Sequence, residues 1–193
     1  RGANGSCLIM RKIILCLAIS FDGFIEGPNG ELDWIVFDSE GGSDLTDFIQ
    51  EIYTVLYGRI SYEMWGNYTL TDSSSEFEKN FYGALNKMDK YVFSTSKEEF
   101  EGNPIVVKSD IPELIQKLKQ QPGKNIWLYG GAGLISTFMN SNLVDEFRIA
   151  VMPVILGKGK PLLKDIENRL KLKLVEVKTS KAGVLGIRYQ AVS

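Results

Sequence analysis

Short apolar runs and amphipathic stretches alternate along most of this chain. Residues 13–20 are almost wholly apolar, which is typical of a strand covered on both faces in the middle of a sheet. Residues 45–53 place apolar side chains at helical spacing instead, and Ser43 or Asp44 before them can serve as the N-cap. A second apolar run, residues 54–57, ends in a glycine and a helix start. Strands and helices are therefore predicted to alternate from the beginning of the chain.

The same rhythm continues through the middle of the chain. A helix is predicted over residues 76–88 after a polar, serine-rich loop, and another over residues 111–120, where Pro112 suits the first turn. Strands are predicted at residues 90–96, 105–107 and 125–129. Units of this kind, a strand followed by a helix, are typical of a parallel sheet.

The pattern changes after Asn142. Residues 146–156 form a long apolar run that predicts a strand, whereas residues 170–178 and 184–191 alternate polar and apolar positions with period two. The polar, glycine-containing turn between these two segments predicts an antiparallel hairpin. The sequence thus predicts an α/β fold with a mixed sheet.

Length and composition fit one globular domain. A chain of 193 residues buries about 70 % of its unfolded surface, so residues 10–193 are interpreted as a single domain. Residues 1–9 carry no pattern and are interpreted as an artificial or frayed leader before a natural start at Met10. The net charge of −2 favours neither nucleic acid nor an anionic membrane as a partner. The apolar run at residues 13–19 is too short to span a bilayer, which favours a cytoplasmic location.

The chain has two cysteines and no histidine, and this limits its chemistry. Too few soft ligands remain for a zinc site, so no metal is expected. Catalysis by a Ser-His-Asp or Cys-His arrangement is excluded as well. Any proton donor must be a carboxylic acid, a tyrosine, a lysine or water.

Residues 125–139 are the most informative stretch for function. An apolar run ends in three glycines within four residues, Gly130, Gly131 and Gly133, and an amphipathic helix pattern follows at once. Glycines let a backbone approach a ligand, and the helix start behind them offers unpaired N–H groups, so the stretch predicts a phosphate site. It is no Walker loop, and Ser136 stands where a Rossmann fingerprint has its third glycine. A glycine turn that binds nothing is the alternative.

Two further positions carry candidate chemistry. Arg59 and Ser61 follow a glycine at the second strand-helix turn, where a guanidinium fork would suit a terminal phosphate. An exposed arginine on a helix end is the alternative. Asp22 lies before Gly23 at the end of the first strand, and a turn cap is the alternative to a catalytic role there, because Asp before Gly is common turn chemistry.

Six short motifs follow one another between residues 13 and 190. They are Ser-x-Asp-Gly-x-Ile at 20–25, Gly-x-Leu-x-Trp at 30–34, Gly-Arg-x-Ser-Tyr-Glu at 58–63, Phe-Ser-Thr at 93–95, Gly-Gly-Ala at 130–132 and Pro-Val-Ile-Leu-Gly-Lys-Gly at 153–159. In this combination the chain resembles the dihydrofolate reductase-like superfamily, and more closely the C-terminal reductase domain of the bacterial bifunctional riboflavin-biosynthesis protein. The resemblance implies a three-layer fold, with a central mixed, mostly parallel sheet, helices on both faces and a C-terminal antiparallel hairpin.

The resemblance also implies an oxidoreductase that transfers hydride from NADPH to a pyrimidine- or pteridine-like ring, similar to 5-amino-6-(5-phosphoribosylamino)uracil reductase of riboflavin biosynthesis. The implied cofactor-binding residues are Ala18, Ile25, Gly58, Arg59, Ser61, Ser94, Thr95, Gly130, Gly131, Ala132 and Gly133. Arg59 with Ser61, and Ser94 with Thr95, would surround the 2′-phosphate. Those at 130–133 would hold the pyrophosphate, with the cis peptide that family members often carry between the two glycines. Ala18, Ile19 and Ile25 would flank the nicotinamide.

The substrate side is less defined by the resemblance. Its candidate catalytic residues are Asp22, Trp34, Asp38 and Asp44. Folate-reducing members bind the pterin with a carboxylate on the first helix, and here Asp44 and Asp47 only approach that position, so dihydrofolate reduction is the weaker subcase. Hydride transfer needs no protein nucleophile, which suits a chain without histidine.

Other readings of the same residues stay open. A non-catalytic nucleotide-binding or regulatory module would keep the groove without the chemistry, and is favoured if Asp44 and Asp47 both point to solvent. A plain scaffold would bind no cofactor. No zinc deaminase signature accompanies the reductase motifs, so a stand-alone reductase domain acting on a small molecule is implied. A homodimer is expected by analogy with the riboflavin-pathway relatives.

Overall fold

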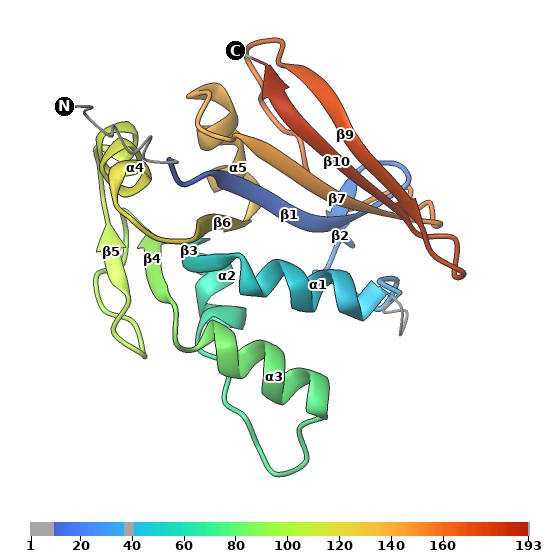
Figure 1. Cartoon of the computed structure of the whole chain (residues 1–193), viewed down its shortest axis with the longest axis horizontal. Helices are drawn as coiled ribbons and strands as arrows, with labels where there is room; N and C mark the ends of the chain where they lie inside the picture. The colour runs from blue at the N-terminus through green and yellow to red at the C-terminus, as the bar shows by residue number, and fades with distance from the viewer. Residues whose placement is uncertain (1–9, 37–40, 193) are drawn as a thin grey trace, which may run out of the picture.

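The computed structural model describes residues 10–36 and 41–192, and the leader expected at residues 1–9 lies outside them. Its main strands are β1 (Ile13–Ser20), β3 (Ile52–Gly58), β4 (Asp89–Phe93), β5 (Ile105–Val107), β6 (Asn125–Gly130), β7 (Glu146–Met152), β9 (Lys171–Thr179) and β10 (Leu185–Val192). Within the described residues they form one eight-stranded sheet in the order β5-β4-β3-β6-β1-β7-β10-β9 (Figure 1).

The sheet is parallel from β5 to β7, and β10 and β9 complete it as an antiparallel hairpin. β1 lies in the middle, with β6 on one side and β7 on the other. Three of its consecutive residues, Ile13, Ile14 and Leu15, are fully buried. This matches their apolar sequence, because a strand between two parallel neighbours is covered on both faces. The predicted mixed, mostly parallel sheet with a terminal hairpin is confirmed.

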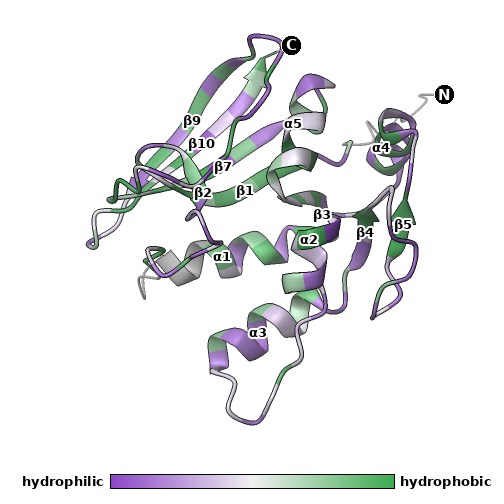
Figure 2. Ribbon diagram, turned by 180° about the vertical axis from the view of Figure 1, so that it is seen from behind, coloured by the Kyte–Doolittle hydropathy of each residue, from purple (hydrophilic) through white to green (hydrophobic). Residues whose placement is uncertain are grey.

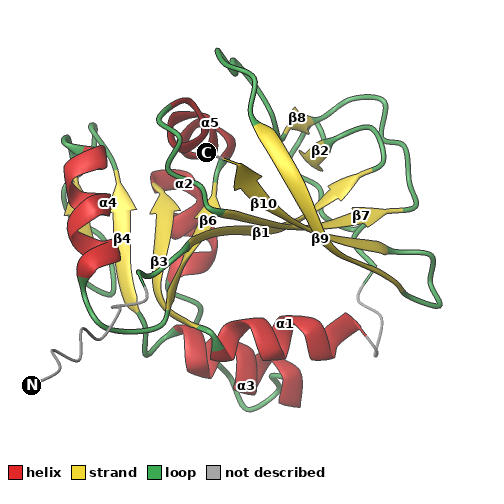
Figure 3. Ribbon diagram, turned by 45° about the horizontal axis from the view of Figure 1, so that its top comes forward, coloured by secondary structure: helices red, strands yellow, loops and turns green. Residues whose placement is uncertain are grey.

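Helices cover both faces of the sheet, which makes three layers. Figures 1 and 3 show α1 (Gly41–Gln50) and α3 (Glu76–Leu85) on one side of the sheet, and α4 (Ile111–Gln120) and α5 (Ala132–Asn140) on the other. A short helix, α2 (Arg59–Ser61), continues directly into one π-helical turn, η1 (Tyr62–Gly66).

The alternation of side chains along β1 divides the core into two clusters. Ile13 and Leu15 pack with the helices α4 and α5, whereas Ile14 packs on the opposite face with Phe48 of α1 and Trp127 of β6. Burying each of these side chains contributes about 1.5–3 kcal/mol relative to an exposed position. Figure 2 shows the contrast between core and surface: β1 is strongly hydrophobic and the surface helix α3 largely hydrophilic.

Several predicted boundaries differ from the structure. The helix predicted over residues 45–53 ends at Gln50, because Ile52 joins β3 opposite Asn125 of β6 and is buried there. The strand predicted over residues 90–96 ends at Phe93, where Ser94 turns its hydroxyl to accept a hydrogen bond from the backbone N–H of Lys97 at 3.0 Å.

The strand predicted over residues 146–156 ends at Met152, since Pro153 after it has no N–H for the ladder. Two strands were not predicted, β2 (Phe24–Glu26) and β8 (Lys160–Pro161). They pair with each other in a small separate sheet, and runs of three and two residues are too short to show a period. Within the described residues, no helix combines the length and the apolar character needed to cross a membrane.

Candidate active site

A groove of about 1390 Å³ opens where several parallel strands end. It begins beside the carboxyl ends of β4 and β3, passes the glycine turn between β6 and α5, and continues past the end of β1 to β2 and the hairpin. The carboxyl edge of an open α/β sheet is the usual place for a ligand site, because neighbouring turns there diverge and leave a crevice.

The implied cofactor residues all line this one groove. They are Ala18, Ile25, Gly58, Arg59, Ser61, Ser94, Thr95, Gly130, Gly131, Ala132 and Gly133. They come from five separate segments of the chain, so their convergence depends on the order of the strands and not on local sequence. Ile19, also expected beside the nicotinamide, does not border the groove.

The turn after β3 and the turn after β6 approach each other closely. A Cβ placed on Gly58 would lie 3.2 Å from the backbone nitrogen of Gly131, and one on Gly131 would lie 3.2 Å from Oγ of Ser61. The peptide between Gly130 and Gly131 is cis, as the resemblance implied. Gly131 is also the N-cap of α5 and has no side chain to bind its first N–H groups, so this helix end can receive a phosphate.

A cluster of charges lies at the β3 end of the groove. Nη1 of Arg59 donates to a carboxylate oxygen of Glu63 at 2.9 Å, and Nζ of Lys97 donates to the other oxygen at 2.7 Å. The bond from Lys97, helped by the nearby charges, lowers the pKa of Glu63. A guanidinium carries five N–H donors, and the bond to Glu63 uses one of those of Arg59, so four remain for a ligand in the groove. The sequence did not identify Lys97, because a lysine in the loop after β4 carries no motif.

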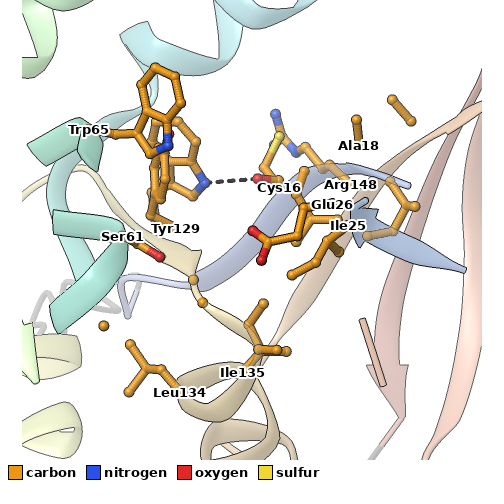
Figure 4. Close-up of a pocket in the computed structure, with 18 of the residues that line it drawn as sticks. Cys16, Ala18, Ile25, Glu26, Ser61, Trp65, Tyr129, Leu134, Ile135 and Arg148 are labelled. Atoms are coloured by element: carbon orange, nitrogen blue, oxygen red, sulfur yellow. Dashed lines mark hydrogen bonds between the residues drawn. The ribbon is translucent and has the colours of Figure 1, made fainter. Parts of the chain in front are cut away.

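The opposite end of the groove is formed by β1, β2 and β8. Ala18 and Ile25 lie here together with Glu26 and Lys160, and Figure 4 shows Ile25, Glu26 and Cys16 around the same space. Glu26 and Lys160 form an ion pair across the small sheet. Neither was identified from sequence, although Glu26 directly follows the Ser-x-Asp-Gly-x-Ile motif.

Two carboxylates of α1 and its end border the groove, Asp47 and Glu51. Glu51 is held by Arg148, whose Nη1 and Nη2 donate to its two oxygens at 3.2 and 2.8 Å. Asp47 borders the groove and makes no hydrogen bond or ion pair with another described residue. Asp44 lies in α1, but its side chain, like the whole of Asp38, is outside the described part of the chain.

Comparison with known proteins identifies the family. The model of the RibD C-terminal domain matches residues 11–185. The chain belongs to the RibD C-terminal domain family. The uncharacterized protein YyaP of Bacillus subtilis (strain 168) is 47 % identical over 182 residues, which is 94 % of this chain and 96 % of YyaP.

Two solved structures show the fold that this RibD-type chain shares. The diaminohydroxyphosphoribosylaminopyrimidine deaminase/5-amino-6-(5-phosphoribosylamino)uracil reductase of Thermotoga maritima superposes with a TM-score of 0.66 at 20 % identity, over 95 % of this chain and 57 % of that one. Dihydrofolate reductase of Enterococcus faecalis, complexed with NADP(H) and RAB-propyl, gives 0.64 at 15 % identity, over 94 % and 97 %. The dihydrofolate reductase-like fold is thereby confirmed.

Two of the substrate-side candidates lie away from the groove in this RibD-type domain. The carboxylate of Asp22 accepts backbone hydrogen bonds from Leu156 at 3.1 Å and Gly157 at 2.7 Å. The indole of Trp34 donates to the carbonyl oxygen of Glu31 at 2.9 Å. Both side chains are thus used in loop contacts, while Leu32, Ile35 and Val36 on the same loop line the groove.

The groove floor of this RibD-type domain is aromatic and neutral. Tyr129 and Trp127 line it, and Nε1 of Trp127 donates to the carbonyl oxygen of Cys16 at 3.0 Å (Figure 4). Burial raises the pKa of the Cys16 thiol to about 12 and raises that of Tyr129 as well. Neither group is ionised near neutral pH, so Cys16 is no nucleophile. An apolar floor of this kind suits a planar ring.

Proposed function

We propose that this protein is an NADPH-dependent reductase of a pyrimidine- or pteridine-like ring, of the 5-amino-6-(5-phosphoribosylamino)uracil reductase type. One observation carries the proposal: apart from Ile19, the residues that the resemblance implies for the cofactor line a single groove. Family membership makes an oxidoreductase the natural class, and the named activity of the Thermotoga relative supplies the reaction type.

The residues present fit a dinucleotide. The turns at Gly58 and Gly131 approach so closely that a Cβ on either glycine would lie 3.2 Å from the other turn, beside a helix N-terminus free of a side-chain cap. Arg59 and Ser94 lie on one side of this close approach and Ala18 on the other. When bound, NADPH supplies the hydride. The chain then has to hold the phosphates, orient the nicotinamide and keep water from the apolar floor.

The position of Asp47 supports the reductase over a non-catalytic binding module. A module that kept only the nucleotide site would need no carboxylate on α1, yet Asp47 borders the groove there. Carboxylate oxygens accept hydrogen bonds from ring N–H and amino groups, so Asp47 is proposed to bind the substrate ring. Dihydrofolate reduction stays the weaker alternative. The catalytic roles of Asp38 and Asp44 stay predictions.

Cofactor binding is the first test. Trp65 and Trp127 line the groove, so quenching of protein fluorescence should report titrations with NADPH and with NADH. We expect a clear preference for NADPH. Arg59→Ala should weaken NADPH about tenfold or more and NADH little, because only NADPH offers a 2′-phosphate to the guanidinium.

Arg169→Ala, an exposed arginine outside the groove, is the matched control. Binding of NADPH should then be followed by assays of its oxidation with 5-amino-6-(5-phosphoribosylamino)uracil and with dihydrofolate. If neither dinucleotide binds, the similarity to the reductases would be one of fold only, and the scaffold without a cofactor would be favoured. If Arg59→Ala weakens the binding of NADPH and NADH equally, Arg59 does not contact the 2′-phosphate.

A homodimer is also proposed, on a surface that the hairpin provides. Leu172, Leu174 and Val177 of the edge strand β9 are 41–51 % exposed, and their partners on β10 place them on one face. Exposed apolar patches of this kind mark interaction sites.

Sedimentation tests the homodimer. It should show a species of twice 21.6 kDa, which Leu174→Glu should dissociate. Lys173→Glu, on the opposite face of β9, should leave the dimer intact. A single 21.6 kDa species at high concentration would contradict the dimer. The cytoplasmic location stays a prediction.

A further inference from the structure

We propose that Glu26 faces the nicotinamide ring and stabilises its positive charge in the oxidised cofactor, so that the groove prefers NADP⁺ to NADPH. This inference rests on the proposed cofactor site and adds a residue that no motif of the sequence identified. Glu26 lines the groove, and its side chain is only 25 % exposed. In Figure 4 its carboxylate points into the cavity, toward the side where Ser61 and Tyr129 lie.

The small sheet holds Glu26 in this place. Glu26 pairs with Lys160 in the register of β2 and β8, and the two side chains form an ion pair. A Cβ at position 159 would collide with the carbonyl oxygen of Glu26, so only Gly159 permits the approach. Leu162 also donates its N–H to the carbonyl oxygen of Gly23 at 2.9 Å. Glu26 is therefore fixed by backbone contacts on both sides and does not depend on a flexible loop.

The order of the strands determines which end of a dinucleotide reaches Glu26. With the 2′-phosphate beside Arg59 and Ser94, and the pyrophosphate at the start of α5, the adenosine half covers the ends of β4 and β3. The nicotinamide half must then extend past β6 to β1 and β2. The distance from β4 to β1 is three strand spacings, about 14 Å. Ala18, Ile25 and Glu26 lie where the nicotinamide would end.

The neighbouring cations do not cancel the field of Glu26 in the groove. Lys160 is more exposed than Glu26, 43 % against 25 %, so water screens the ammonium more strongly than the carboxylate. Arg148, which Figure 4 labels near Glu26, is bound by Glu51 and by the buried Glu146. Arg188, which also lines the groove, donates to Glu146 as well. Glu26 is thus a carboxylate of this end whose own partner, Lys160, is the more exposed member of the pair.

A carboxylate at this end of the groove favours hydride transfer. The C4–H bond of the dihydronicotinamide breaks, the hydride forms a C–H bond on an electrophilic carbon of the substrate ring, and solvent supplies the proton that the ring heteroatom takes up. The cofactor is oxidised and the substrate reduced, and the nicotinamide gains one positive charge. A fixed carboxylate beside it stabilises the charge that develops in the transition state.

The test compares dissociation constants for NADP⁺ and NADPH, measured by fluorescence quenching without any substrate. Glu26→Gln keeps the shape of the side chain and removes its charge. We expect it to shift the ratio of the two constants about threefold to tenfold against NADP⁺. Lys160→Met should shift the ratio the other way, toward NADP⁺, because it removes the opposing cation. Asp33→Asn, on the following loop and outside the groove, should leave the ratio unchanged.

The opposite signs expected for Glu26→Gln and Lys160→Met keep the test decisive, since a general loss of folding would weaken both cofactor forms alike. Thermal unfolding of each variant checks that it is folded. If wild-type protein binds both forms and Glu26→Gln leaves their ratio unchanged, the proposal is wrong while the proposed function survives. If neither form binds to wild type, both are overturned together.

Discussion

The carboxylate of Asp22 binds the backbone N–H of Gly157 at 2.7 Å, across 135 positions of the chain. A second bond, from the N–H of Leu156 at 3.1 Å, occupies the other oxygen. These contacts connect the turn after β1 to the loop after β7, where Gly157 has a φ of 72° that glycine adopts readily. Asp22 thus binds the loop after β7, whereas the turn-cap alternative concerned its own turn.

We expect Asp22→Asn to lower stability more than it lowers cofactor affinity. Desolvation raises the pKa of Asp22, but hydrogen bonds from Ser20, Gly157 and Leu156 outweigh this and lower it below 3.8. A lowered pKa stabilises the folded state above the unfolded value, and the contribution is lost as the pH falls through the folded value. The melting temperature of Asp22→Asn should therefore fall below that of wild type at pH 7, and the two should converge as the pH falls through the lowered pKa of Asp22. A loss of activity at unchanged stability would point to a catalytic role instead.

Glu146 is fully buried, and its carboxylate is surrounded by Arg148, Arg188 and Lys12. Burial raises its pKa, but the hydrogen bonds from Arg188 and Arg148 outweigh burial and lower it. Glu146→Gln would leave cations without their partner, so we expect a loss of about 3–5 kcal/mol in the free energy of unfolding. Urea unfolding at pH 7 measures it. Glu176→Gln, an exposed position on β9, should change stability by about 0.5 kcal/mol or less.

The difference between wild type and Glu146→Gln should also shrink in acid. The pKa of Glu146 is lowered in the folded state, so its contribution is present above the ordinary glutamate value of 4.5 and is lost as the pH falls below the folded value. A difference that stays unchanged down to the lowest pH at which both proteins are folded would mean that packing, and not charge, explains the loss.

Two neighbouring tyrosines should respond in opposite directions to the loss of a hydroxyl. The hydroxyl of Tyr57 is buried and has no hydrogen-bond partner within the described residues, whereas that of Tyr62 donates to the carbonyl oxygen of Glu101 at 2.7 Å. Tyr57→Phe should raise the free energy of unfolding by about 1 kcal/mol, and Tyr62→Phe should lower it by about as much. The rings pack edge to face at 5.5 Å, so both variants keep that contact. Destabilisation by Tyr57→Phe would indicate a water bound to its hydroxyl.

Gly133 and Gly83 allow stability and binding to be separated. Both lie in helices, and an added Cβ would meet no protein atom within 4 Å at either position. Each Gly→Ala variant should stabilise its helix by about 1 kcal/mol at most. Only Gly133 lines the groove, so only Gly133→Ala should weaken NADPH, by filling space proposed for the pyrophosphate. If the two variants bind NADPH equally well, Gly133 does not border the bound pyrophosphate.

The amino-acid sequence by itself determined the elements and the type of fold. The apolar run of β1, the helix Ile111–Gln120 and the glycines that end β6 were all recognised correctly, because burial and backbone freedom act over neighbouring residues. Motifs in one order also identified the family that the match to residues 11–185 confirms.

Only the tertiary structure decided which side chains meet. Glu26 and Lys160 are separated by more than 130 positions. They form an ion pair because the short strands β2 and β8 lie side by side, near the end of β1. Asp22, chosen as a catalytic candidate, is committed to Leu156 and Gly157 for a similar reason. The physical cause is that strand order, and not sequence distance, determines contacts in a sheet. Local patterns carry the periodicity of each strand, but no local signal encodes its neighbour.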